Sequence, residues 1–82
     1  MKLLDWPNSA LRDLRRLDPP VARAVLQALE LLARTGQGDV TRLKAQGHTM
    51  RLRVGDWRVQ YLAISPNMIR VLRIRHRSEA YR

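Results

Sequence analysis

The stretch MRLRVGDWRVQYLAISPNMIRVLRIRH, residues 50–76, decides the fold, because its apolar residues recur at nearly every second position. A period of two is typical of β-strands that bury one face and leave the other open. Gly55-Asp56 and Ser65-Pro66-Asn67 interrupt the alternation with residues that favour turns. We therefore expect three consecutive strands, over residues 50–54, 57–64 and 68–76.

The two turns determine which residues lie opposite each other. A two-residue loop at Gly55-Asp56 pairs Arg53 with Arg58, and one at Pro66-Asn67 pairs Arg58 with Arg75. A four-residue loop over 65–68 gives the same second register. This register predicts an apolar face made of Met50, Leu52, Val54, Trp57, Val59, Tyr61, Leu72 and Ile74. It predicts an arginine cluster on the opposite face, made of Arg51, Arg53, Arg58, Arg73 and Arg75.

A three-residue second loop would reverse the third strand and send Arg73 and Arg75 into the core. Burying two charges without visible partners is costly, so we reject that register.

The N-terminal half follows a helical period. After a short strand over 2–6 that Pro7 ends, a helix capped by Asn8 or Ser9 carries its apolar stripe at Leu11, Leu14 and Leu17. Its other side is expected to be polar, with Arg12, Asp13, Arg15 and Arg16.

Asp18-Pro19-Pro20 ends the first helix and begins a second one, with Asp18 as N-cap and Pro19 in the first turn. This second helix is expected to run to about residue 33, with Gly36 at its C-terminal end. Residues 39–48 are expected to be a connector, from which Leu43 reaches the core.

These elements predict one α+β domain over residues 1–82, in the order β-α-α-β-β-β. The expected architecture is an antiparallel sheet with a helical hairpin packed on one face.

The chain is strongly basic, with a formal net charge of +9 over 82 residues. Fourteen of its sixteen basic residues are arginines, and residues 51–82 contribute +6 of the net charge. A basic surface of this kind predicts a polyanionic partner. Like charges opposite each other in a sheet are destabilising by about 0.2–1 kcal/mol per pair, so the arginine cluster is best explained by a bound anion such as a phosphate backbone. A merely solvated basic face is the alternative.

Other classes of function are disfavoured. There is no cysteine, and two histidines do not make a zinc site, so we expect no metal and no cofactor. The chain shows neither a membrane-spanning apolar run nor a signal peptide, so we expect a cytoplasmic protein without a membrane partner.

The tail after the third strand adds further candidate residues. His76 is a candidate acid or base, since histidine is the side chain suited to proton transfer at neutral pH, and Tyr81 offers a phenol and a stacking surface. Each also has a purely structural interpretation: His76 as an exposed strand-end residue without a function, and Tyr81 as a residue that anchors the C-terminus to the core. Arg77 lies between them and is expected to help bind the polyanionic partner.

Four segments in this order resemble the RelE/ParE toxin superfamily, and within it the RelE-like branch that cleaves mRNA. They are ALRDLRRL (10–17), GDVTRLK (38–44), RLRVGDWRV (51–59) and HRSEAY (76–81), and the resemblance covers essentially the whole chain. It implies a RelE-like fold and the toxin of a type II toxin–antitoxin pair. The implied partners are an antitoxin, mRNA and the ribosome, with a toxin–antitoxin hetero-oligomer as the implied assembly.

The activity that the resemblance implies is metal-independent cleavage of mRNA on the ribosome, by attack of a 2′-hydroxyl on the adjacent phosphate. Carried over by position, the basic pair on the first hairpin strand falls on Arg51 and Arg53. The phosphate-binding arginine falls on Arg58, the strand-end arginine on Arg75 and the tail tyrosine on Tyr81.

The chain departs from the family pattern at the basic pair, where that pattern has lysines. Arginine binds phosphate well, but its guanidinium stays protonated throughout the ordinary pH range, so it is a poor base. Either His76 or Tyr81 therefore activates the 2′-hydroxyl, or catalysis depends on stabilisation of the phosphorane by Arg58 and Arg75. The alternative functions are a ParE-like inhibitor of DNA gyrase and a non-enzymatic nucleic-acid-binding module.

Overall fold

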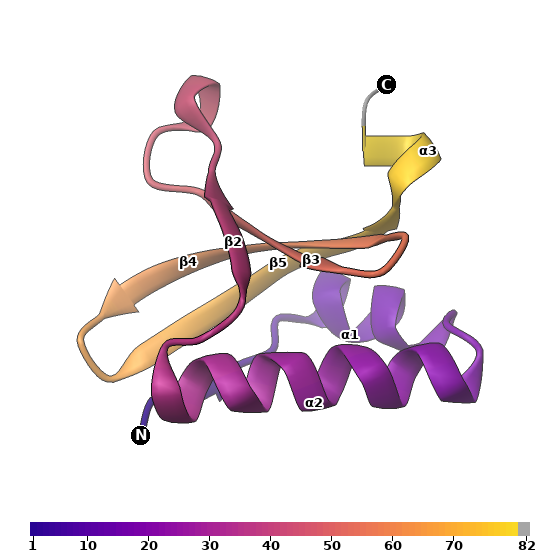
Figure 1. Cartoon of the computed structure of the whole chain (residues 1–82), viewed down its shortest axis with the longest axis horizontal. Coiled ribbons are helices and arrows are strands. Elements are labelled where there is room, and N and C mark those ends of the chain that lie inside the picture. Colours follow the sequence, from indigo (N-terminus) through magenta and orange to yellow (C-terminus); the bar gives the residue numbers. More distant parts are fainter. Residues whose placement is uncertain (81–82) are drawn as a thin grey trace.

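The computed structural model describes residues 1–80 as a five-stranded sheet with both main helices on one side (Figure 1). The sheet order is β1-β5-β4-β3-β2, and only β1 runs parallel to its neighbour, β5. In chain order the elements are β1 (Leu3–Asp5), α1 (Asn8–Arg15), α2 (Pro19–Thr35), β2 (Asp39–Arg42), the 3₁₀ turn η1 (Lys44–Gln46), β3 (Met50–Val54), β4 (Trp57–Ser65), β5 (Met68–His76) and α3 (Arg77–Ala80). The predicted α+β class and the helical hairpin beside one sheet face are confirmed.

The three expected strands form the centre of the sheet in the expected register. Arg53 lies opposite Arg58, Arg58 opposite Arg75, and Ser65 opposite Met68. Gly55 opens the first turn with φ 59°, a left-handed conformation that glycine adopts without strain and that tight hairpin loops require.

The register of β4 and β5 shifts in two places, between Gln60 and Tyr61 and between Ala63 and Ser65. Arg73 lies opposite Gln60, but Val71 lies opposite Tyr61, so Leu72 has no cross-strand partner. A bulge reverses the facing of the residues beyond it. Leu72 is therefore only half-buried and is not part of the core, contrary to the prediction, and Val71 and Ile69 fill the core instead.

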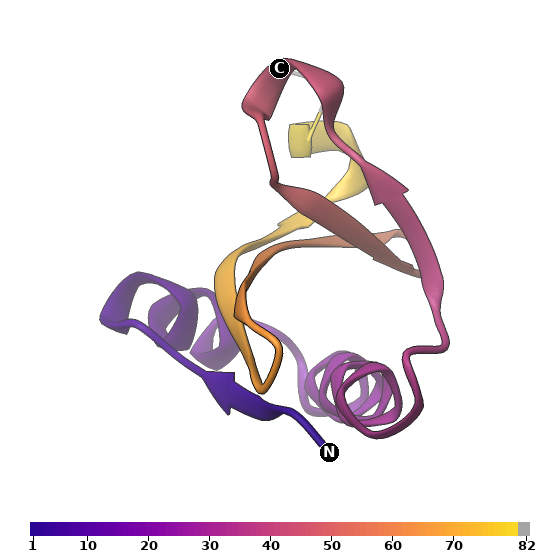
Figure 2. The same ribbon diagram turned by 90° about the vertical axis from the view of Figure 1, so that its left-hand side faces the viewer.

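Two further strands complete the sheet. Residues 39–42, expected to lie in a connector, form β2 by pairing antiparallel with β3, and Val40 packs against the core. Leu43 donates its N–H to the carbonyl of Thr49 (2.9 Å), which closes the loop around η1. At the other edge, β1 pairs with the first residues of β5. The curvature of the sheet around α2 is visible in Figure 2.

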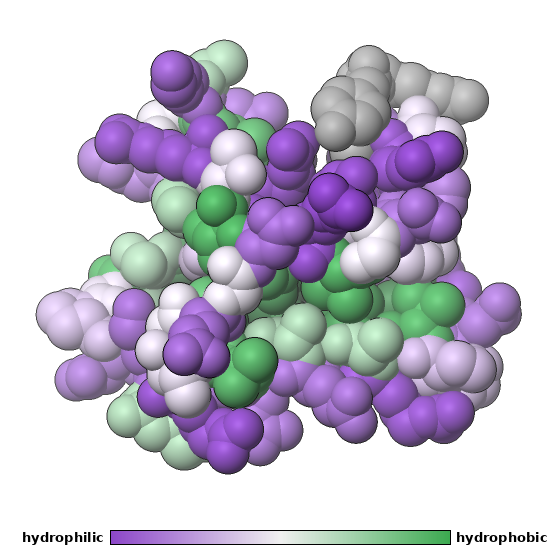
Figure 3. Space-filling model, in the orientation of Figure 1, coloured by the Kyte–Doolittle hydropathy of each residue, from purple (hydrophilic) through white to green (hydrophobic). Residues whose placement is uncertain are grey.

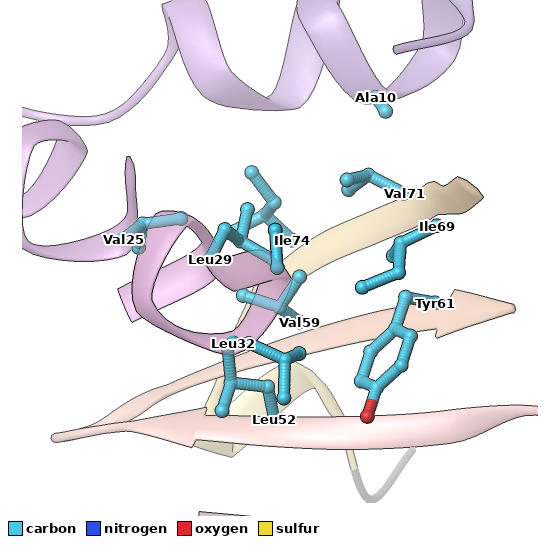
Figure 4. Close-up of a cluster of buried hydrophobic side chains, with 11 residues drawn as sticks. Ala10, Val25, Leu29, Leu32, Leu52, Val59, Tyr61, Ile69, Val71 and Ile74 are labelled. Carbon is cyan, nitrogen blue, oxygen red and sulfur yellow. The ribbon is translucent and has the colours of Figure 1, made fainter. Parts of the chain in front are cut away.

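The core lies between the sheet and the helices (Figure 4). Helix α2 supplies Val25, Leu29, Leu32 and Ala33, and α1 supplies Ala10. As expected, α2 begins at Pro19 after Asp18 and is followed by Gly36, whose φ is 77°, but it extends to Thr35 rather than to about residue 33. None of the helices within residues 1–80 is long and apolar enough to cross a membrane.

Asp13 is buried, with 8% of its surface exposed, although the helical period placed it on the polar side of α1. Its Oδ2 accepts hydrogen bonds from the backbone N–H of Ile74 and from Nε of Arg73, both at 3.0 Å. The paired part of β1 extends only to Arg70 of β5. Asp13 therefore satisfies a donor on the section of the β5 edge that β1 does not cover.

Asp13→Ala should lower the free energy of unfolding by about 1–3 kcal/mol, because a buried N–H of β5 loses its acceptor. Asp13→Asn keeps an oxygen for Ile74 N–H and should lose less. Urea unfolding of both variants measures the difference. An unchanged stability of Asp13→Ala would show that the β5 edge does not depend on this contact.

Burial raises the pKa of the Tyr61 phenol above its usual value of 10.0. The protonated phenol then contributes to the free energy of unfolding. This contribution is complete below the pKa of the unfolded state, and it is lost as the pH rises through the pKa of the folded state. Wild-type stability should therefore fall more steeply than that of Tyr61→Phe as the pH rises above about 10. Parallel pH dependences measured by denaturant unfolding would contradict the expected role of Tyr61.

Candidate functional site

The face of the sheet opposite the helices lies between two projections, the η1 loop on one side and α3 on the other (Figure 1). The space-filling view shows a notch between them in which strongly hydrophilic side chains gather (Figure 3). The strands β3, β4 and β5 form this face, so their outward-pointing residues are the candidate ligand-binding residues.

Three arginines lie side by side across this face as consecutive cross-strand partners. Arg53 on β3 faces Arg58 on β4, which faces Arg75 on β5. Cross-strand partners point to the same side of a sheet, so these three form a continuous arginine row. Arg51 is the next outward residue of β3, opposite Gln60, and is half-buried.

Arg58 is the central and most buried member of the row, with 9% of its surface exposed. Its Nη1 donates hydrogen bonds to the carbonyl oxygens of Gly55 (2.9 Å) and Trp57 (3.1 Å), both at the β3–β4 turn. The turn thus holds one nitrogen of the guanidinium, and Nη2 and Nε remain as donors for a ligand. A guanidinium fixed in this way loses little freedom when it binds an anion.

The charge of the arginine row is only weakly compensated. Asp39 Oδ2 lies 3.8 Å from Nε of Arg53, and both side chains are more than half exposed, so the pair is screened by solvent. Within residues 1–80, no carboxylate comes within 4.0 Å of the guanidinium of Arg58 or Arg75. The row therefore presents a positive surface suited to a phosphate group.

Arg73 lies in the predicted register but turns away from the arginine row. Its Nε is 3.0 Å from the Asp13 carboxylate on α1, and its side chain remains partly exposed. It lines a cleft of about 250 Å³ beside α1, β5 and α3, whose other lining residues include Arg16, Trp57, Glu79 and Arg75 of the arginine row. Arg73 was predicted to belong to a cluster of five arginines, but its ion pair with Asp13 holds it apart from the other four. Asp13 was expected to face solvent.

His76 lies on the opposite face from the arginine row. It is the cross-strand partner of Trp57, and the two rings meet edge to face, 5.2 Å apart at 82°. Trp57 packs against the core, so His76 belongs to the apolar side of the sheet at its end. The predicted register already implies this position, because pairing Arg58 with Arg75 also pairs Trp57 with His76.

Arg77, the residue after His76, lies beside the β3–β4 turn. Arg77 donates its backbone N–H to the carbonyl of Asp56 (2.7 Å), and its Nη1 lies 4.0 Å from the Asp56 carboxylate. Both side chains are exposed, so the ion pair is weak. Tyr81, the other predicted catalytic residue, lies outside the described residues.

Arg58→Met should lower the free energy of unfolding by about 1–3 kcal/mol, because two backbone carbonyls at the turn lose their donor. The exposed Arg53→Met is the matched control and should change stability by less than about 0.5 kcal/mol. Thermal or urea unfolding gives both values. A neutral or stabilising effect of Arg58→Met would mean that Arg58 has no structural role at the turn.

Comparison with known proteins identifies the family. No curated protein matches the chain in sequence. Among solved structures, it is similar to a chain of the RelBE2 toxin–antitoxin complex from Mycobacterium tuberculosis, with 26% identity and a TM-score of 0.78 over 92% of this chain and 96% of that one. The isolated E. coli RelE toxin aligns at 18% identity and a TM-score of 0.79, over 99% and 96% of the two chains.

E. coli YafQ shares the fold over the full length of both chains, with 11% identity and a TM-score of 0.77. A sequence profile described as "ParE toxin of type II toxin-antitoxin system, parDE" matches residues 4–81. This match spans nearly the whole chain and agrees with the superfamily that the four sequence segments resemble. The protein therefore belongs to the ParE toxin family of type II toxin–antitoxin systems, within the RelE/ParE superfamily.

Proposed function

We propose that this toxin is a ribosome-dependent endoribonuclease that cleaves mRNA. The observation that carries the proposal is the arginine row, in which Arg58 is held by the β3–β4 turn between two neighbouring arginines. Three guanidinium groups on adjacent strands concentrate positive charge on one surface, which suits the anionic backbone of RNA. Action on ribosome-bound messages would place the toxin in the cytoplasm.

The proposed reaction is an internal transfer of the phosphate. The 2′-hydroxyl loses its proton and attacks the adjacent phosphorus, the P–O5′ bond breaks, and the 5′-oxygen leaves and is protonated. The products are a 2′,3′-cyclic phosphate and a 5′-hydroxyl end. Arg58 and Arg75 stabilise the charge that develops on the phosphorane, and Arg51 and Arg53 bind the neighbouring backbone.

The place of His76 on the far face of the sheet bears on the proton transfer. His76, one of the two residues considered as base, lies on the opposite face of the sheet from the arginine row, which supports Tyr81 or electrostatic stabilisation in its place. Arginine has too high a pKa to take this role. Arg77, exposed beside the β3–β4 turn, is positioned to contact RNA beyond the cleaved phosphate.

An antitoxin is the proposed protein partner. The family belongs to toxin–antitoxin pairs, and a similar chain from Mycobacterium tuberculosis was solved as a toxin–antitoxin complex. A net charge of +9 favours a partner with an acidic segment, which would neutralise the toxin by covering the arginine row. The two proteins would then form a hetero-oligomer.

A ParE-like action on DNA gyrase is the second candidate, because the matched family carries the ParE description. The two functions differ in what they damage. A gyrase inhibitor breaks DNA and leaves messages intact, whereas the proposed nuclease creates new mRNA 5′ ends.

The test is induced expression of the wild-type chain, Arg58→Ala, Arg75→Ala and the control Arg23→Ala, followed by mapping of mRNA 5′ ends. Arg23 is exposed on α2, away from the arginine row, and its removal lowers the net charge equally. We expect growth arrest with cleaved messages for wild type and Arg23→Ala, and cleavage slowed about 100-fold or more for the other two. Arg75→Ala provides an independent result, because within residues 1–80 no hydrogen bond or ion pair joins the Arg75 side chain to the turn that holds Arg58.

Growth arrest with intact messages and broken DNA would overturn the nuclease in favour of gyrase inhibition. RNA binding without cleavage by the purified toxin on programmed ribosomes would indicate a non-enzymatic binding module.

A further inference from the structure

The single-turn helix α3 is attached to the sheet by contacts at its first residues. It begins directly after His76, the last residue of β5, and spans only four residues. So short a helix has little stability of its own, because most of its backbone N–H groups lack an intrahelical acceptor. Its position therefore depends on the groups that accept those hydrogen bonds.

Two such groups are present. The backbone N–H of Arg77 donates to the carbonyl of Asp56 (2.7 Å), and that of Ser78 donates to Nδ1 of His76 (3.3 Å). The Ser78 hydroxyl lies 3.0 Å from the same Nδ1. A side-chain acceptor that binds the N–H two residues later is the arrangement of a helix N-cap. The His76 ring is in turn held by its edge-to-face contact with Trp57.

This arrangement determines which nitrogen of the neutral imidazole carries the proton. A neutral imidazole has one N–H donor and one acceptor nitrogen. Since Nδ1 accepts the N–H of Ser78, the proton lies on Nε2. The only lone pair that could take a proton from RNA is therefore already used within α3, and it lies on the opposite side of the sheet from Arg58.

We propose that His76 is a positioning residue, which caps α3 and fixes it against the same turn that holds Arg58. The β3–β4 turn binds the Arg58 guanidinium through Gly55 and the first residue of α3 through Asp56. The cap by His76 completes this connection, so that the relative placement of α3 and the arginine row depends on it. This inference rests on the proposed RNA cleavage only for its activity readout.

Two substitutions of His76 separate positioning from base catalysis. His76→Asn keeps a side-chain acceptor suited to a helix cap but has no basic nitrogen, whereas His76→Phe keeps a ring against Trp57 but has no acceptor. If His76 positions α3, His76→Asn should cleave at nearly the wild-type rate, and His76→Phe about fivefold more slowly, as expected for loss of one cap. If His76 is a general base, both variants should be slower by about 100-fold or more, which would overturn the inference.

Substitutions of Ser78 provide the reciprocal test, because they leave the imidazole intact. Ser78→Pro removes the donated N–H and should slow cleavage as His76→Phe does, whereas Ser78→Ala keeps it and serves as the control. Unchanged cleavage by Ser78→Pro would contradict the cap.

A readout independent of activity distinguishes failure of this inference from failure of the proposed function. In ¹⁵N NMR of the wild-type protein, His76 should be the tautomer protonated at Nε2, and the amide of Ser78 should exchange faster in His76→Phe but not in His76→Asn. A proton on Nδ1, or equal exchange in all three proteins, would overturn the cap whether or not the toxin cleaves RNA.

Discussion

The structure depends on the register of β3, β4 and β5, which the Gly55-Asp56 turn sets for β3 and β4 and the Pro66-Asn67 turn sets for β4 and β5. Because side chains alternate between faces, the register that buries Leu52, Val59 and Ile74 also places Arg53, Arg58 and Arg75 in one row. Each pair of facing arginines costs about 0.2–1 kcal/mol. A slip by one residue would expose the apolar side chains and bury the arginines. Burial of the apolar side chains on one face therefore holds the strands in the register that keeps the arginines adjacent on the other face. The hydrogen bonds of Arg58 to the turn join the charged face to the feature that sets the register.

The parts of the fold that depend on local patterns could be predicted from the sequence. Alternation defined β3 and the two long strands, and Asp18-Pro19 and Gly36 marked the ends of α2. The bulge that displaces Leu72 left no local signal, because the apolar residues on either side of it are equally suited to a core. Residues 39–42 form a strand only because β3 offers an edge to pair with, and four residues carry too short a pattern to show this.

The candidate site was predictable in its backbone register but less so in its side chains. The contact between Asp13 and Arg73 joins residues 60 positions apart, so no local pattern could reveal that it removes Arg73 from the row. The burial of Arg58 depends likewise on a turn carbonyl rather than on a neighbouring charge. The place of His76, in contrast, followed from the predicted register, because pairing Arg58 with Arg75 also pairs Trp57 with His76.

The sheet order has a consequence for how the chain folds during synthesis. β5, near the C-terminal end, is the strand that lies between β1 and β4 and that receives Asp13 from α1. The first strand and first helix therefore lack their partner until residues up to 76 are available, and folding must close a loop that spans most of the chain. A shortened or unfinished chain would lose Arg75 and the strand that anchors the N-terminus together. The arginine row is therefore assembled only when the domain folds, and a partly synthesised toxin lacks this candidate binding site.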